Sequence, residues 1–113
     1  HLAKPQMYSS EGFTVWKRLM QELAPLEHVN FKISGLVTEA GPKCTAQDFQ
    51  AHMDTALELF GPKRLLWGSD WPVSYATHHY ETLLEFWHHW TGNWSIAERE
   101  QVETGTPTRL YKL

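Results

Sequence analysis

The chain has 113 residues, 42% of them hydrophobic and 20% charged, which suffices to bury the core of one small domain. Its net charge of −3, without a block of basic residues, argues against nucleic acid as a partner, and no apolar run approaches the roughly 18 residues of a membrane span. No secretion-signal pattern opens the sequence, and its single cysteine, Cys44, excludes a disulfide framework and a cysteine-based zinc site, so the cytoplasm is the expected compartment.

The first predicted elements are the end of a strand and a helix. His1–Pro5 is expected to close a strand and start a loop, and His1 is either a pocket residue or a solvated side chain. After a polar stretch in which Ser9 or its neighbour can cap a helix, apolar residues at helical spacing predict a helix over Phe13–Ala24, which Pro25 ends. The apolar stripe of this helix consists of Phe13, Trp16, Met20 and Leu23.

A strand is predicted over Val29–Ser34, because apolar and polar residues alternate there. Lys32 in this strand is either a rim residue that reaches a pocket or an outward residue whose stem covers apolar surface. Ser34 lies at the carboxyl end of the strand and is therefore expected near the pocket. The next stretch, Leu36–Cys44, contains a Gly-Pro turn signal and is predicted to be a loop that forms a second pocket wall.

A second long helix is predicted over Ala46–Phe60. Thr45 and Asp48 before it have the spacing of a capping box with a shortened acid. Gly61 is expected to cap the carboxyl end, and Pro62 stops the helix.

An apolar run then predicts a buried strand over Arg64–Gly68. Asp70 lies just past the carboxyl end of that strand, the edge at which parallel α/β folds carry their chemistry. An aspartate at this position is also a common turn residue. Because Trp71 and Pro72 prevent a helix from starting at once, we expect a loop up to about His78, long enough to border a pocket.

Helices make up the predicted remainder of the chain. Apolar spacing predicts a helix over Tyr80–Trp90, and Ser95 with Glu98 forms a capping box for a short charged helix, Ile96–Glu103. Pairs of adjacent histidines flank the first of these helices. Neighbours in a helix point about 100° apart, so neither pair is expected to bind a metal from one face.

Three stretches of the chain carry motifs in a fixed order. Leu66–Val73 reads LWGSDWPV and follows FGPKR at Phe60–Arg64, His1–Pro5 reads HLAKP, and Lys32–Leu36 reads KISGL. In this order and spacing they resemble the last, a middle and the next-to-last strand motifs of the amidohydrolase-related (amidohydrolase 2) hydrolases. The resemblance is strongest to the sugar-lactone and pyrone-lactone branch of that family.

This resemblance implies an α/β fold, a (β/α)8 TIM barrel in which parallel strands alternate with helices. A whole barrel needs about 250 residues, so residues 1–113 are expected to be the C-terminal portion of one barrel domain, incomplete as given and inactive alone. Thr106–Leu113 resembles the closing helix of the family, with Pro107 where the family prefers alanine. A complete small α/β domain is the alternative.

The resemblance also implies a hydrolase that opens a small sugar-acid or pyrone-type lactone. Asp70 is the expected general base, and His1 is expected to polarise the carbonyl group. Trp71, Lys32 and Ser34 are the expected substrate-binding residues. Trp71 is a stacking wall for a sugar ring or simply a packed loop aromatic.

Metal dependence stays open at this point, because the wider superfamily uses histidine and aspartate ligands for zinc whereas the lactonase branch includes metal-free members. If a divalent metal such as zinc or manganese is used, His1 and Asp70 are its expected ligands. A decarboxylase or hydratase of the same superfamily, with Asp70 as acid and base, is the second hypothesis. A non-catalytic α/β fragment that only packs or binds is the third. The expected partner is a small carbonyl substrate, with no nucleic acid or membrane.

Overall fold

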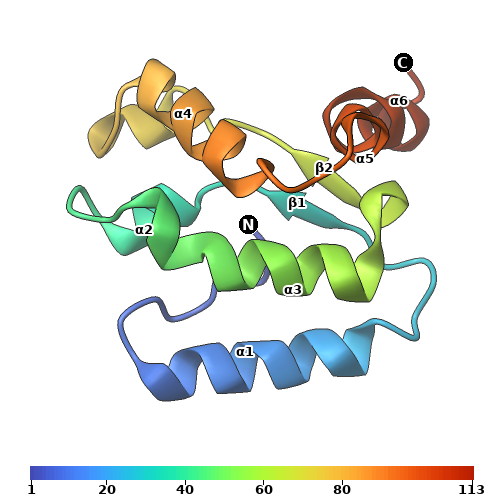
Figure 1. Cartoon of the computed structure of the whole chain (residues 1–113), viewed down its shortest axis with the longest axis horizontal. Helices are drawn as coiled ribbons and strands as arrows, with labels where there is room; N and C mark the ends of the chain where they lie inside the picture. Colours follow the sequence, from blue (N-terminus) through green and yellow to red (C-terminus); the bar gives the residue numbers. More distant parts are fainter.

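The computed structural model describes residues 1–113, and helices alternate with two short strands along the chain (Figure 1). The helices and strands are α1 (Ser10–Leu23), β1 (Phe31–Ile33), α2 (Leu36–Ala40), α3 (Gln50–Phe60), β2 (Leu65–Trp67), α4 (Tyr80–Trp90), α5 (Ile96–Glu100) and α6 (Thr106–Tyr111). Short 3-10 turns cover Ala46–Phe49, Pro62–Arg64 and Val73–Ala76, and a π-helical turn covers Gln101–Gly105. No helix is both long and apolar enough to cross a bilayer.

The two strands pair in parallel, as predicted. Phe31 lies opposite Leu65 and Ile33 lies opposite Trp67. Both strands are shorter than the predicted ranges. Only Phe31–Ile33 and Leu65–Trp67 pair with each other, and before β1 the Val29 amide donates to the Leu26 carbonyl at 3.0 Å instead of to a strand. Parallel strands need a crossover connection, and α3 provides it.

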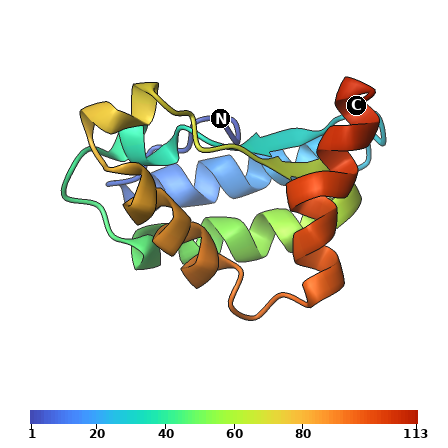
Figure 2. The same cartoon turned by 90° about the horizontal axis from the view of Figure 1, so that it is seen from above.

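The long helices cover one face of this sheet. In Figure 2 the strands run along the upper part of the molecule, and α3 and α4 lie below them. Helix α1 packs against α3, where Phe13 and Trp16 contact His52. Phe31 and Ile33 point into this helical layer, because Phe31 packs against Phe60 of α3 with ring centroids 4.9 Å apart and Ile33 belongs to the buried core. Side chains alternate along a strand, so Lys32 points to the opposite face. The core contains Trp16, Met20, Met53, Leu65, Leu83 and Trp87, among others.

The helix ends follow the local signals of the sequence. Ser9 caps α1 by accepting a hydrogen bond from the Gly12 amide at 3.1 Å, and α4 covers the predicted residues Tyr80–Trp90. The reciprocal bonds of Ser95 and Glu98, at 3.1 and 2.8 Å, confirm the capping box before α5. The capping bonds each satisfy an amide that the first helical turn leaves without a partner.

Two predicted loops contain helical turns. The prediction for Leu36–Cys44 is wrong in its first half, because α2 begins directly after Gly35 and buries Leu36 and Val37 against the core. The loop expected up to about His78 is present, because α4 begins only at Tyr80, but it contains a 3-10 turn over Val73–Ala76, in which the Ser74 amide donates to the Asp70 carbonyl at 2.9 Å. Both helical turns form although the sequence signals for a helix are weak, because buried side chains and local backbone hydrogen bonds stabilise them.

The C-terminal helices are continuous with one another. The predicted helix over Ile96–Glu103 does not end there, because the π-helical turn connects α5 to α6, and Pro107 is accommodated in the first turn of α6. Trp87 of α4 contacts the π-helical turn, since its Nε1 donates to the Glu103 carboxylate at 2.6 Å. The carboxylate thereby satisfies an indole donor whose ring is otherwise buried.

His52 in α3 is a buried titratable group inside the helical layer. It is 4% exposed, packs against the rings of both Phe13 and Trp16 of α1 with centroids 5.0 and 4.9 Å apart, and has no hydrogen-bond partner on either nitrogen. This burial lowers the pKa of His52 below its usual 6.5, because the charged ring cannot be solvated there.

We therefore expect the protein to lose stability as the pH falls from 7.5 to 5.5. Below pH 6.5 the unfolded chain binds a proton at His52 that the folded chain resists, so protonation favours unfolding. The His52→Leu variant should lose less stability over this range, as measured by chemical denaturation at both pH values. His28→Leu is the matched control, because His28 is exposed. Equal losses in wild type and His52→Leu would contradict the prediction.

Candidate functional site

The carboxyl ends of the two strands meet at one edge of the sheet. The Gly68 amide donates to the Ile33 carbonyl at 3.0 Å, which continues the pairing one step beyond the strands. Ser34 and Gly35 therefore leave β1 beside the point where Ser69 and Asp70 leave β2. This arrangement follows from the parallel register, which aligns the carboxyl ends of both strands.

The first residues of the chain join the same edge from the other side of β1. The Leu2 amide donates to the Lys32 carbonyl at 2.9 Å, and the Leu2 side chain is fully buried. Leu2, Ala3 and Lys4 have positive φ angles, so the backbone turns sharply here and the Lys4 amide donates back to the His1 carbonyl. The predicted strand end at His1–Pro5 is thus a turn that is hydrogen-bonded to the free edge of β1.

His1, Ser34 and Asp70 come together at this edge. The Nδ1 atom of His1 is hydrogen-bonded to the Ser34 hydroxyl at 2.8 Å, and its Nε2 atom lies 3.8 Å from Oδ2 of Asp70. The side chains of His1 and Asp70 are 36% and 20% exposed, so both reach solvent, whereas Ser34 is buried. One ring nitrogen is therefore held by the protein and the other faces a carboxylate.

The position of the His1 ring depends on Gly35. A β-carbon built at Gly35 would lie 2.6 Å from Cγ and Nδ1 of His1, and the backbone at Gly35 has a φ of +67°. A side chain is thus excluded both by the ring and by the backbone conformation. Sequence reasoning did not assign a role to Gly35, although a glycine directly after a predicted strand is a signal of close approach.

The side chain of Lys32 lies over Gly68, just as the His1 ring lies over Gly35. A β-carbon built at Gly68 would lie 2.7 Å from Cε of Lys32, so the lysine stem passes over Gly68 on the sheet face opposite the helices. Lys32 therefore does not point outward toward the helices, which was one of the two alternatives for this residue. The sequence indicated a close backbone turn at Gly68, but not that the glycine leaves space for the Lys32 stem.

Trp71 lies next to Asp70 but contacts a different set of residues. Its ring is 47% exposed and packs edgewise against Tyr75 and Tyr80, with centroids 5.2 and 5.8 Å apart. Its amide donates to the Ser69 hydroxyl at 3.2 Å. Asp70 itself has a φ of +59°, which places its side chain and Trp71 on a tight turn.

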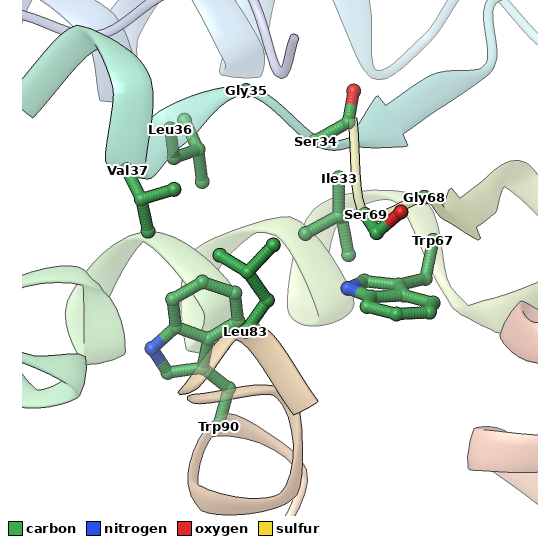
Figure 3. Close-up of a pocket in the computed structure, with 10 residues that line it drawn as sticks. All are labelled: Ile33, Ser34, Gly35, Leu36, Val37, Trp67, Gly68, Ser69, Leu83 and Trp90. Carbon is green, nitrogen blue, oxygen red and sulfur yellow. The ribbon is translucent and has the colours of Figure 1, made fainter. Parts of the chain in front are cut away.

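A small cavity lies directly behind the strand ends, between α2 and α4 (Figure 3). Apolar side chains form most of its wall, and it has room for only about one water molecule. In Figure 3 the Ser34 hydroxyl points away from Leu83 and Trp90, which form the opposite wall. This cavity is too small for a substrate, so the chemistry is expected at the open edge where His1 and Asp70 lie.

The loops that follow the two strands touch one another at Cys44 and His78. Sγ of Cys44 lies 3.8 Å from Nε2 of His78. Burial, with Asp48 nearby, raises the pKa of the Cys44 thiol to about 11, and burial lowers the pKa of His78. Both groups are therefore neutral at pH 7, and the pair links the loops rather than providing a thiolate nucleophile.

Replacing Gly35 tests whether this glycine holds the His1 ring in place. Gly35→Ala should lower the free energy of unfolding by about 1–2 kcal/mol through backbone strain and should also displace the ring. Gly61→Ala is the matched control, because Gly61 has a φ of +68° and no atom near a built β-carbon. The measurements are denaturant unfolding and the NMR signals of the His1 ring. Unchanged His1 signals in Gly35→Ala would contradict the proposed contact.

Known proteins resemble most or all of the chain. It is 40% identical over 123 aligned residues to an L-fucono-1,5-lactonase from Burkholderia multivorans, which covers all of this chain and 42% of that protein. An L-fucono-1,5-lactonase from Burkholderia ambifaria is 41% identical over 80 residues, 71% of this chain and 27% of that protein. The chain thus spans less than half the length of these relatives.

Solved structures agree with the sequence comparison. A crystal structure of an amidohydrolase from Burkholderia multivorans with bound zinc matches with a TM-score of 0.88 at 37% identity, covering all of this chain and 42% of that one. A second structure from the same organism, with bound HEPES, also gives a TM-score of 0.88, at 36% identity. The model of the amidohydrolase family matches residues 1–113. The chain therefore belongs to the amidohydrolase family.

Proposed function

We propose that the intact protein hydrolyses a small lactone of the sugar-acid type, with Asp70 as the general base. The observation that carries this proposal is the 3.8 Å approach of the His1 ring to the Asp70 carboxylate, at the carboxyl edge of two parallel strands. Support comes from the two relatives named L-fucono-1,5-lactonase, each about 40% identical to this chain.

Lactone hydrolysis needs an activated water and a polarised carbonyl group. Asp70 accepts a proton from the water as its oxygen attacks the carbonyl carbon. The tetrahedral oxyanion then collapses, the bond between the carbonyl carbon and the ring oxygen breaks, and the ring oxygen takes up the proton from Asp70. The product is a hydroxy acid. Asp70 is partly exposed, so a water can reach it from the open edge.

His1 faces the same substrate position. Its Nδ1 atom is fixed by Ser34, which orients the ring and leaves Nε2 directed toward Asp70. With a proton on Nε2, the ring donates to the carbonyl oxygen and stabilises the oxyanion. Ser34 then acts mainly by holding His1, in addition to the substrate contact expected for it.

Lys32 and Trp71 complete the proposed binding site. The lysine stem crosses Gly68 on the sheet face opposite the helices that pack on Phe31 and Ile33. There its ammonium group can bind the hydroxyl groups or the product carboxylate. Trp71 follows Asp70 on the same turn and presents a half-exposed ring.

The donor atoms at this edge are compatible with zinc. Imidazole nitrogen and carboxylate oxygen are common zinc ligands, and the bond of Nδ1 to Ser34 leaves Nε2 of His1 available. His1 and Asp70 would therefore hold the metal, with further ligands from outside this pair, since no group of three or more such side chains occurs in the chain. A bound zinc ion supplies Lewis-acid polarisation of a carbonyl group.

We also propose that these residues form part of a (β/α)8 barrel. The support is the parallel pair of strands with its crossover helix, the turn bonded to the free edge of β1, and relatives more than twice as long as this chain. In this arrangement the face that carries Lys32 lines the barrel interior. The active edge then corresponds to the carboxyl end of the barrel strands.

Asp70→Asn tests the general base in the intact protein. The substitution keeps the shape of the side chain and removes the proton acceptor, so kcat for hydrolysis of L-fucono-1,5-lactone should fall by about 10²-fold or more while the melting temperature is kept. His1→Ala should also reduce hydrolysis, through weaker polarisation of the carbonyl group or weaker metal binding. The measurements are steady-state kinetics and thermal melts.

His88→Ala is the control, because His88 is an exposed residue in the last turn of α4. It should leave kcat and KM nearly unchanged. Near-wild-type turnover in Asp70→Asn would refute the assignment and leave the carboxylate as a group that shapes the turn. Carbon dioxide release or hydration in place of ring opening would favour a decarboxylase or hydratase.

A further inference from the structure

Three aromatic side chains beside Asp70 are exposed, although large apolar rings are usually buried. Trp71, Tyr75 and Tyr80, here called the Trp71 cluster, are 47%, 57% and 39% exposed. They contact one another rather than the core, with ring centroids 5.2 and 5.8 Å apart. A contiguous exposed aromatic group of this kind marks a binding surface more often than a lone exposed residue does.

The geometry of the cluster leaves the indole accessible. The planes of both tyrosine rings are tilted by more than 70° from Trp71, so neither tyrosine stacks flat on it. Ser69, Trp71 and Tyr80 line an open hollow on the surface. This hollow combines one large π face with two hydroxyl groups and contains no charged side chain.

The same turn carries the cluster and the proposed general base. The Trp71 amide donates to Ser69, and the Asp70 carbonyl accepts from the Ser74 amide at 2.9 Å, so the backbone on both sides of Asp70 is held. Ser69 and Trp71, the two neighbours of Asp70 in the sequence, both line the hollow, so the hollow lies beside the turn that carries Asp70.

We propose that the Trp71 cluster is a stacking subsite for the hydroxylated ring of a sugar lactone, an inference that rests on the proposed lactonase function. The C–H groups of such a ring are polarised by neighbouring oxygens and pack favourably on the negative face of an indole. The hydroxyls of Ser69 and Tyr80 bind the hydroxyl groups of the ring. No charged side chain lines the hollow, so this subsite contacts the neutral, hydroxylated part of the lactone ring.

Two lactones of equal ring size distinguish this subsite from the catalytic centre. In the intact protein, Trp71→Leu should raise KM for L-fucono-1,5-lactone about threefold to tenfold and leave kcat within about twofold. For δ-valerolactone, which lacks hydroxyl groups, kcat/KM should change less than about twofold. Trp71→Phe should recover part of the loss. Tyr111→Leu is the matched control, since Tyr111 in α6 is 59% exposed and remote in sequence from this turn.

Other outcomes overturn the proposal. An unchanged KM in Trp71→Leu would refute the subsite while leaving the lactonase function intact. Equal losses for both lactones together with a lower melting temperature would show that Trp71 only packs against the rest of the protein.

If neither lactone is hydrolysed by wild type, the proposed function fails and the subsite is judged by binding. The protein is then labelled with 5-fluorotryptophan and titrated with L-fucose, with the Trp71 signal identified by its absence in Trp71→Leu. A shift of that fluorine signal supports the subsite, and an unmoved signal refutes it.

Discussion

The parallel pairing of β1 with β2 is the constraint on which the rest of the structure depends. Because Phe31 faces Leu65 and Ile33 faces Trp67, both strands end at the same edge, and the loops that carry Ser34 and Asp70 emerge side by side. A parallel pair requires a crossover, so α3 must return the chain and cover one face of the sheet. An antiparallel pairing would place these loops at opposite edges and separate the candidate residues.

Two glycines shape the candidate site because they have no side chains. Gly35 leaves space for the His1 ring, and Gly68 leaves space for the stem of Lys32. Each glycine thus admits a long side chain from a neighbouring segment into a position that a β-carbon would occupy. The result is a cluster of one carboxylate and two basic groups, held by backbone geometry at an open edge.

Apolar side chains lie on one side of the strand ends, and the polar candidate residues lie on the other. Behind the ends, Leu36, Val37 and Trp90 close a small apolar cavity that anchors the loops. In front of them, His1 and Asp70 remain partly exposed and can reach a substrate. The rigid apolar side supports the polar side, which is the arrangement that a preorganised site requires.

Local signals in the sequence were sufficient for the long elements and for the place of Asp70. Helical spacing predicted Tyr80–Trp90, a capping box predicted the start of α5, and the apolar run before Gly68 placed Asp70 past a strand end. Such signals act over a few residues and need no partner.

The contacts that define the candidate site could not be predicted in this way. The bond between His1 and Ser34 and the packing of His1 on Gly35 join residues more than 30 positions apart. Likewise, α2 forms because Leu36 and Val37 are buried by the core, and His52 is buried by rings of α1. Only the tertiary structure decided these features, because their free energy comes from neighbours that the chain brings together when it folds.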